Sequence, residues 1–341
     1  MSEKVALITG ITGQDGAYLT DLLLKKDYEV IGCYRRTASS DFWRINHLGI
    51  SDHPKLKLVS NDLLDFGSCF RLISEHEPTE VYNLAAQSFV GASFEQPTVT
   101  TNVNCIGPLN LLESIRIVNK GIKFYQASTS EMFGKVQEVP QKISTPFYPR
   151  SVYGVSKLYS HWLTINYQES YNMHASSGIL FNHESELRGL EFVTRKITHS
   201  LSMIKKNQVK DFKLGNLNAK RDWGYAPEYV EGIWKMLQHD NPETFILSTG
   251  VSYTVRDFVN YACEALEFKT EWQGDGLNEK LVNLDNGSII ISIDEKFFRP
   301  TEVDALIGDN SKAKDILKWE PKVTVKDIVD KMVRADMDKI K

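Results

Sequence analysis

Four polar side chains in two short stretches of this 341-residue sequence could carry out acid-base chemistry. Tyr153 and Lys157 are four residues apart in SVYGVSK, so they share one face if that stretch is helical. A phenol with a pKa of about 10 is a poor base at neutral pH, and a nearby ammonium favours its phenolate. Tyr153 is therefore the candidate base, and Lys157 is the cation expected to activate it.

The other two side chains, Thr129 and Glu131, lie in STSEMFG, directly after an apolar strand-like run. A hydroxyl at that strand end can hydrogen-bond an alcohol that is being oxidised, and this is the role expected of Thr129. Hydride transfer needs no carboxylate. A carboxylate at Glu131 could remove a proton from the carbon next to a newly made ketone. Oxidation, proton removal and loss of a leaving group together make a dehydration.

A glycine-rich segment, ITGITGQDG, follows the first predicted strand and opens the first predicted helix. Glycine lets the backbone approach a pyrophosphate closely, and a helix N-terminus favours the negative charge. The spacing is G-x-x-G-x-x-G, the variant found in short-chain dehydrogenases. The residues expected to contact the cofactor here are Gly10, Thr12, Gly13, Gln14, Asp15 and Gly16.

The second predicted strand ends in CYRRTASS, where an NAD enzyme would usually place an acid to bind the ribose 2′-hydroxyl. Arg35 and Arg36 occupy that position, and guanidinium groups suit a 2′-phosphate. This favours NADP, although Asp41 remains available as an acid.

Two further strand ends are expected to contact the cofactor. Asp62 and Leu63 end the third strand, where short-chain dehydrogenases place an adenine contact. Small residues at the end of the fourth strand leave room for a ligand to cross the sheet. The candidates there are Leu84, Ala85, Ala86, Gln87 and Ser88.

The elements that position these residues alternate along the first half of the chain. Strand-like runs are at 5–8, 29–33, 57–59, 81–84, 123–127 and 174–180, and helical patterns are at 18–26, 106–118 and 153–171. This alternation predicts an α/β fold with a doubly wound parallel sheet of the Rossmann type. Residues 1–181 are expected to bind NADP and carry the catalytic residues.

From residue 182 onward the pattern mixes short strands, such as 245–248, with helices at 255–266 and 323–336. A polar stretch at 273–288 interrupts them. We expect residues 182–341 to form a smaller, mixed α/β lobe that mainly binds the substrate and returns some elements to the main sheet.

Composition and charge indicate which kinds of partner and which location to expect for this protein. The net charge is −4 with no sustained basic stripe, so nucleic acid is a poor partner. Cys33, Cys69, Cys105 and Cys263 are widely spaced without a C-x-x-C pair, which indicates neither a metal site nor a disulfide framework. The N-terminus carries no apolar leader, and no stretch reaches transmembrane length. We therefore expect a cytoplasmic protein that does not interact with membranes.

The ordered motifs of the whole chain resemble the GDP-mannose 4,6-dehydratases of the extended short-chain dehydrogenase superfamily. The motifs that carry the resemblance are GITGQDGAYL, YNLAAQS, SFEQP, FYQASTSEMFG, PFYPRSVYGVSK, GILFNHES, FVTRKIT, LGNLNAKRDWG and FFRPTEVD. The resemblance implies a nucleotide-sugar dehydratase whose tightly held NADP is reduced and reoxidised within one turnover.

The resemblance also implies roles for individual residues. Tyr153 would take the C4 hydroxyl proton, Thr129 would orient that hydroxyl, and Glu131 would remove the C5 proton and protonate the departing C6 hydroxyl. Lys157 would hold the nicotinamide ribose. Cofactor contacts would include His183 and Arg188; the GDP-sugar would contact Ser88, Asn182, Lys196, Arg221, Arg299 and Glu302. The loop with Arg35 and Arg36 would reach a neighbouring subunit, which implies a homotetramer, with a dimer as the alternative.

One position departs from the family, which commonly has proline where this chain has Glu186. The change could loosen the loop beside the cofactor and adds a negative charge near its phosphates. Three other functions stay open: a dehydratase acting on a GDP-manno-heptose, a nucleotide-sugar reductase or epimerase, and a catalytically silent NADP-binding protein. A reductase or epimerase would not need a carboxylate at Glu131, and a silent protein would not need the Tyr153/Lys157 pair.

Overall fold

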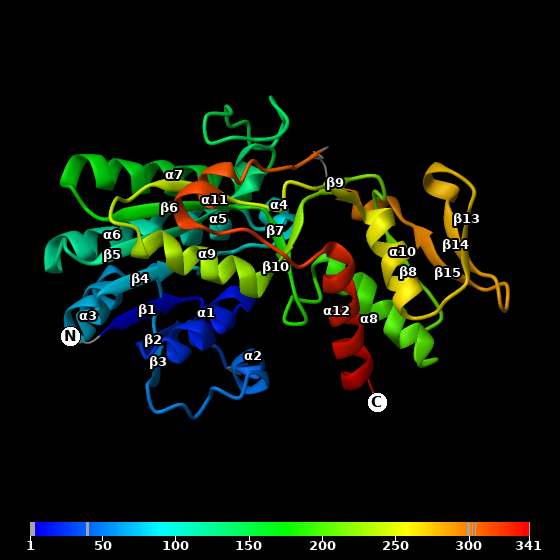
Figure 1. The fold of residues 1–341 in the computed structure, drawn as a ribbon, viewed down its shortest axis with the longest axis horizontal. Coiled ribbons are helices and arrows are strands. Elements are labelled where there is room, and N and C mark those ends of the chain that lie inside the picture. The colour runs from blue at the N-terminus through cyan, green and yellow to red at the C-terminus, as the bar shows by residue number, and fades with distance from the viewer. Residues whose placement is uncertain (1–3, 39–40, 299–300, 302, 304, 341) are drawn as a thin grey trace.

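A seven-stranded parallel sheet forms the larger part of the molecule (Figure 1). The structure, a computed structural model, describes residues 4–38, 41–298, 301, 303 and 305–340. In spatial order the strands are β11 (Thr244–Leu247), β6 (Ala175–Leu180), β5 (Lys123–Thr129), β4 (Glu80–Asn83), β1 (Val5–Thr9), β2 (Glu29–Tyr34) and β3 (Leu56–Ser60). The chain runs outward in both directions from the β1–β4 pair, so the strand order reverses there. In such sheets ligands bind beyond the carboxyl ends of the strands at the reversal.

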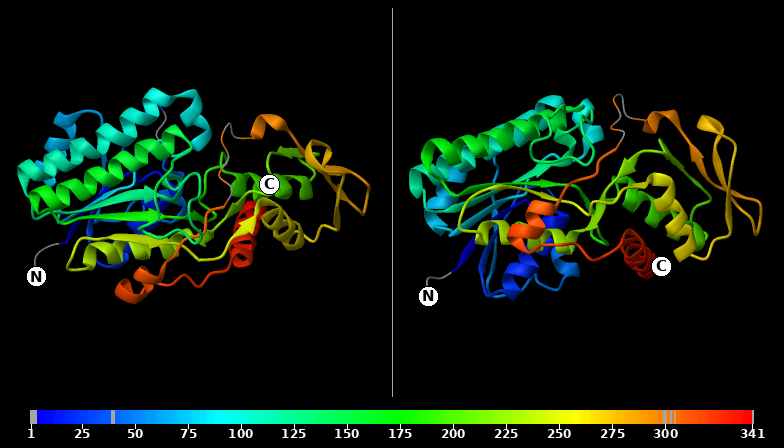
Figure 2. Two further views of the ribbon diagram at one scale, coloured as in Figure 1. Left: turned by 90° about the horizontal axis from the view of Figure 1, so that it is seen from above. Right: turned by 45° about the horizontal axis from the view of Figure 1, so that its top comes forward.

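Helices cover both faces of this sheet, as Figures 1 and 2 show. One face packs against α1 (Gln14–Lys25), α2 (Trp43–His47), α9 (Ala226–Gln238) and α11 (Ser311–Leu317). The other face packs against α3 (Phe66–His76), α6 (Gly107–Val118) and α7 (Val152–Tyr171). The segment between β4 and α6 holds α4 (Val90–Glu95), α5 (Pro97–Thr101) and a π-helical turn, η1 (Asn102–Ile106). Each face therefore has its own buried apolar core.

The smaller lobe lies beyond the carboxyl ends of the sheet (Figure 2). Its four-stranded sheet has the order β13 (Thr270–Gln273), β14 (Lys280–Asn283), β15 (Ile289–Ile293) and β8 (Phe212–Leu214). Three helices pack on this sheet through an apolar core that belongs to the smaller lobe: α8 (Val193–Lys205), α10 (Val255–Ala265) and α12 (Val325–Lys339). Two short pairs, β7 (Asn182–Glu184) with β10 (Trp223–Tyr225) and β9 (Lys220–Arg221) with β12 (Tyr253–Thr254), join the lobe to the main sheet.

The predicted doubly wound fold is confirmed, with local differences. Helix α1 begins at Gln14, four residues before the expected start, because Gly13 is its N-cap and the polar first turn is buried by tertiary contacts. The polar stretch at 273–288 contains β14, whose Leu281 and Val282 are buried between β13 and β15. Strand β11 pairs in parallel with β6 and so extends the main sheet.

Candidate active site

The glycine-rich segment 10–16, predicted to be the phosphate loop and called so below, leaves no room for side chains at two of its glycines. Gly10 has a φ of +73°, and a Cβ there would lie 2.9 Å from the backbone of Ala85. At Gly16 a Cβ would lie 2.3 Å from the Gly10 carbonyl oxygen and 2.6 Å from the Ile11 Cα. Only residues 10–13 therefore separate β1, which ends at Thr9, from α1, which begins at Gln14, and the N-terminus of α1 lies at the carboxyl edge of the sheet.

A charged pair connects the start of α1 to the smaller lobe. His183 places Nδ1 2.7 Å from the Phe181 carbonyl oxygen and Nε2 2.8 Å from Asp15 Oδ2. Both ring nitrogens face acceptors, so both must donate, and the imidazole is the cation. Burial opposes this charge, but Asp15 raises the pKa of His183 above 6.5. Burial likewise opposes ionisation of Asp15, yet the charge and hydrogen bond of His183 lower the pKa of Asp15 to about 2.

The end of β5 presents Thr129 and Glu131 side by side. Thr129 Oγ1 accepts a hydrogen bond of 3.2 Å from the Glu131 amide and caps a single 3-10 turn, η2 (Ser130–Met132). Both side chains are more than nine-tenths buried. A Cβ at Gly154 would lie 2.8 Å from the Glu131 carbonyl oxygen, so α7 can approach this turn because position 154 is glycine.

Helix α7 carries Tyr153 and Lys157, and it brings Tyr153 next to Thr129 and Glu131. Ser151 caps the helix by accepting a hydrogen bond from the Gly154 amide, and both site side chains are buried. Burial raises the pKa of Tyr153 to about 12; the Thr129 hydroxyl opposes this rise and the Glu131 carboxylate adds to it. Burial lowers the pKa of Lys157 to about 8, against the charge of Asp15. The protein by itself therefore keeps Tyr153 protonated at neutral pH.

Sequence reasoning missed Asn104, a buried residue of the π-helical turn. Its side chain accepts from the Gln87 amide at 2.9 Å and donates to the Gln87 carbonyl and to Ser156 Oγ, both at 3.1 Å. Ser156 Oγ donates in turn to the Tyr153 carbonyl at 2.8 Å. Asn104 thus ties the end of β4 to α7 between its two site residues. Nothing in the spacing of TNVNCIG signals this contact.

The remaining cofactor candidates lie at the predicted strand ends. Arg35 and Arg36 directly follow β2 and are exposed. Asp62 is exposed after β3, whereas Leu63 is buried. The residues after β4 are half-buried from Leu84 to Gln87 and exposed at Ser88. A side-chain ladder behind them, in which Thr9 donates to Asn83 at 2.7 Å and Asn83 donates to Gln126 at 2.8 Å, joins β1, β4 and β5.

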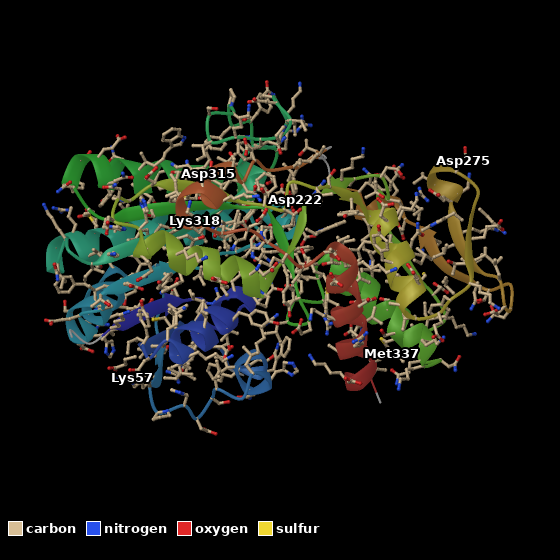
Figure 3. The ribbon with its side chains drawn as sticks, in the orientation of Figure 1. Lys57, Asp222, Asp275, Asp315, Lys318 and Met337 are labelled. Atoms are coloured by element: carbon tan, nitrogen blue, oxygen red, sulfur yellow. The ribbon has the colours of Figure 1, made fainter. Side chains whose placement is uncertain are left out.

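The substrate candidates of the smaller lobe have other contacts. Lys196 donates to the Lys213 carbonyl at 2.6 Å, and its ammonium lies 3.7 Å from the centre of the Phe297 ring. Arg221 is buried on β9 and donates to the Val303 carbonyl at 2.9 Å. Figure 3 shows its neighbour Asp222 near the middle of the molecule, where the sheet meets the smaller lobe. Asn182 begins β7, next to His183. Arg299 and Glu302 lie outside the described residues.

Arg188 and Glu186 follow His183 in one segment. Arg188 pairs with Glu184 at 3.1 Å, and its charge opposes the rise in the Tyr153 pKa. Tyr225 Oη donates one long, bifurcated hydrogen bond to the Glu186 carboxylate, 3.4 Å from each oxygen. Burial lowers the pKa of Arg195 on α8 and of Lys339 on α12, and the charge of Glu186 opposes that lowering in both. Arg195 and Lys339 thus compensate the negative charge of Glu186, a charge that the proline common in the family at this position does not have.

Two features are absent from the described residues. No group of three or more His, Cys, Asp or Glu side chains among them could hold a metal ion. In the same part of the chain, no helix is long and apolar enough to cross a membrane.

The N-terminal phosphate loop, the doubly wound sheet and the Tyr153/Lys157 pair together define an extended short-chain dehydrogenase/reductase. The fold agrees with that of a dTDP-glucose 4,6-dehydratase from Streptomyces venezuelae solved with NAD and TYD. Their TM-score is 0.83 at 21% identity, with 98% of this chain and 97% of the other covered.

Similarity of sequence identifies the family more specifically than similarity of fold. Residues 7–332 match the family model described as GDP-mannose 4,6 dehydratase. A GDP-mannose 4,6 dehydratase of Drosophila melanogaster is 49% identical over 98% of this chain and 87% of that protein. A GDP-mannose 4,6-dehydratase of Sinorhizobium fredii is 48% identical over 98% of this chain and 97% of that protein. The chain belongs to the GDP-mannose 4,6-dehydratase family.

Proposed function

We propose that the protein converts GDP-D-mannose to GDP-4-dehydro-6-deoxy-D-mannose and water. The observation that carries this proposal is the buried carboxylate of Glu131, two residues from Thr129 and close enough to Tyr153 for its charge to raise that pKa. A reductase or epimerase needs the hydroxyl, phenol and ammonium but not this acid. Membership of the family supports GDP-mannose as the substrate.

The proposed cofactor is NADP, and the residues present fit a dinucleotide. The backbone cradle at Gly10 and Gly16 has no space for a Cβ. The buried Gln87 Oε1 has no hydrogen-bond partner among the described residues, so a bound ligand could donate to it. Arg35 and Arg36, exposed directly after β2, support the 2′-phosphate form. Bound NADP would supply the hydride acceptor for C4 and the hydride donor for C6, and the positive charge of its oxidised nicotinamide would favour the Tyr153 phenolate.

The protein's own residues supply the proton transfers. Thr129 orients the C4 hydroxyl, and Tyr153 takes its proton as C4 becomes a ketone. The ketone acidifies the C5 proton, which Glu131 removes. Glu131 then gives this proton to the departing C6 hydroxyl, and water leaves. When C6 receives hydride, C5 takes up a proton from solvent, and Tyr153 releases to solvent the proton that it took from the C4 hydroxyl, so both residues return to their starting states. Lys157 is proposed to hold the nicotinamide ribose, and the burial of its side chain next to the other site residues of α7 supports this role.

The proposal extends to the GDP-sugar contacts, the assembly and the location. Ser88, Asn182, Lys196, Arg221, Arg299 and Glu302 are proposed to bind the GDP-sugar. We propose a homotetramer in which Arg35 and Arg36 reach a neighbouring cofactor site. The uncharged, half-exposed α7 side chains Val155, Tyr159 and Trp162 support association through this helix. The four free, buried cysteines support a reducing, cytoplasmic environment.

The test is product mass spectrometry after incubation with NADP and either GDP-mannose or GDP-manno-heptose. The proposal predicts loss of one water from GDP-mannose at the higher kcat/KM. Preferential loss of water from the heptose would change the substrate but keep the chemistry. Glu131→Gln is expected to lower kcat by about 100-fold or more, whereas Glu95→Gln, at an exposed acid ending α4, leaves it unchanged. Undiminished dehydration by Glu131→Gln would refute the proposed role.

A further inference from the structure

Arg44, on the short helix α2, connects the phosphate loop to the segment that follows His183. Its Nε donates to the Leu187 carbonyl at 2.7 Å, and its terminal NH1 nitrogen donates to the Thr12 carbonyl at 2.9 Å. Thr12 belongs to the phosphate loop. Leu187 belongs to the segment that follows His183 and is itself fully buried in the core beneath α1 and α9. No step of the proposed reaction uses Arg44.

The geometry suits a guanidinium in particular. Two carbonyl oxygens from different segments must be reached at once, and the planar fork of arginine supplies two fixed donors. The guanidinium also lies 4.5 Å from the centre of the adjacent Trp43 ring, which restricts its orientation. A lysine ammonium is a single point of donation on a flexible chain, so it cannot fix both carbonyls in the same way.

Other polar contacts join the same two segments. Gln14 Nε2 donates to the His183 carbonyl at 3.1 Å, and Ser185 Oγ donates to Gln14 Oε1 at 2.7 Å. With the Asp15–His183 pair, these contacts lie directly between the phosphate loop and the 183–187 segment. Arg44 adds a third element, α2, which follows the coil that carries Arg35 and Arg36.

The charge of Arg44 is held by groups on several elements. Burial lowers its pKa, the carboxylates of Glu191 and Asp41 oppose that shift, and Arg188 and Arg195 add to it. The residue remains charged at neutral pH because the ordinary arginine pKa is above about 12. Its two acceptors are neutral carbonyls, so the side chain brings positive charge to the phosphate loop.

We propose that Arg44 is a positioning residue that latches the 183–187 segment to the phosphate loop and thereby slows release of the bound dinucleotide. The inference rests on the proposed function only in requiring that the site bind NADPH or NADH. The latch holds one backbone carbonyl of each segment, so its loss leaves the segments joined only by the contacts of Gln14 and Asp15 and removes no side chain proposed to contact substrate.

The experiment measures NADPH dissociation from the full-length protein without any sugar, by the loss of its fluorescence when excess NADP is added. Arg44→Met removes both donors and is expected to raise the dissociation rate about tenfold or more, because each lost hydrogen bond has a charged donor. Arg44→Lys keeps the charge but not the fork and is expected to fall between wild type and Arg44→Met. The control is Arg71→Met, at an exposed arginine of α3 whose ion pair is 4.0 Å long; it should leave the rate unchanged.

A dissociation rate for Arg44→Met within about twofold of wild type would overturn the proposal. If Arg44→Met does not fold, Arg44→Lys decides: a faster release with an unchanged urea midpoint supports the latch, and an unchanged rate refutes it. Wild-type protein that binds neither NADPH nor NADH would also overturn it. Because no sugar is present, a failure to dehydrate GDP-mannose leaves this measurement intact and refutes only the proposed function.

Discussion

The Asp15–His183 pair makes a pH-dependent contribution to stability that Asp15→Asn should remove. The pKa of Asp15 falls from 3.8 to about 2 on folding. At roughly 1.4 kcal/mol per pKa unit, this shift corresponds to about 2 kcal/mol of stability. The Asp15 contribution is fully present above pH 3.8 and is lost as the pH falls through about 2. The Asp15 side chain is one-quarter exposed, which limits the screening by solvent.

The histidine sets the upper limit of this pH window. Its folded pKa lies above 6.5, so the stability gained from charged His183 is fully present below pH 6.5 and is lost as the pH rises through the folded pKa. Urea unfolding of cofactor-free protein should show Asp15→Asn destabilised by about 2 kcal/mol near pH 6 and by clearly less near pH 9. An NMR titration should find the pKa of His183 above 6.5 in wild type and below 6.5 in the variant, where burial and the charge of Arg188 are opposed only by the hydrogen bond to the Phe181 carbonyl.

A matched control lies on the same helix. Asp21 pairs with Lys25 at 2.6 Å, but the lysine is largely exposed. Asp21→Asn is expected to change the free energy of unfolding by less than about 1 kcal/mol, equally at both pH values. If Asp15→Asn showed the same loss of stability near pH 6 and near pH 9, or no larger loss than Asp21→Asn, the assignment of a charged His183 would be wrong.

Three further substitutions test the energetics. Lys157→Met should stabilise the cofactor-free protein near pH 7 by about 3 kcal/mol, because the lysine pKa falls from 10.5 to about 8 on folding. That gain should shrink between about pH 8 and 10.5 in urea unfolding, and a gain that persisted at higher pH would contradict it. Gly16→Ala should weaken NADPH binding at least about tenfold in a fluorescence titration, since its Cβ meets the loop backbone; unchanged affinity would contradict the cradle. Arg195→Met should destabilise the protein by about 3–5 kcal/mol by leaving Asp336 buried and unpaired, and adding Asp336→Leu should recover most of that loss; no recovery would show that the arginine acts by packing instead.

Periodicity and glycine spacing predicted the strands of the main sheet, the helices α1, α6 and α7 that cover it, and the glycine-rich turn between β1 and α1. These features depend on contacts that are local or that follow from a regular repeat. Helix α7 was expected at 153–171 and begins at Val152, because Ser151 supplies its cap. Strand β14 was not predicted, since its four residues lie in a polar stretch and are buried by strands from elsewhere in the chain.

The residues that hold the site in place through long-range hydrogen bonds could not be predicted in the same way. Asn104 contacts Gln87 and Ser156, which lie 17 and 52 residues away in the chain. Arg44 reaches a carbonyl 143 residues away. Such contacts involve backbone atoms or single amide groups, for which the partner's residue type carries no signal. Only the assembled fold shows which side chains hold the predicted catalytic residues in place.

We propose that Tyr153, Thr129 and Glu131, with NADP as the hydride carrier, together perform an internal oxidation, elimination and reduction. GDP-mannose deuterated at C4 tests this, with mass spectrometry and NMR of the product made in ordinary water. We expect loss of one water and retention of the deuterium, moved to C6. Loss of the label to the solvent, its retention at C4, or a product that has not lost water would contradict it.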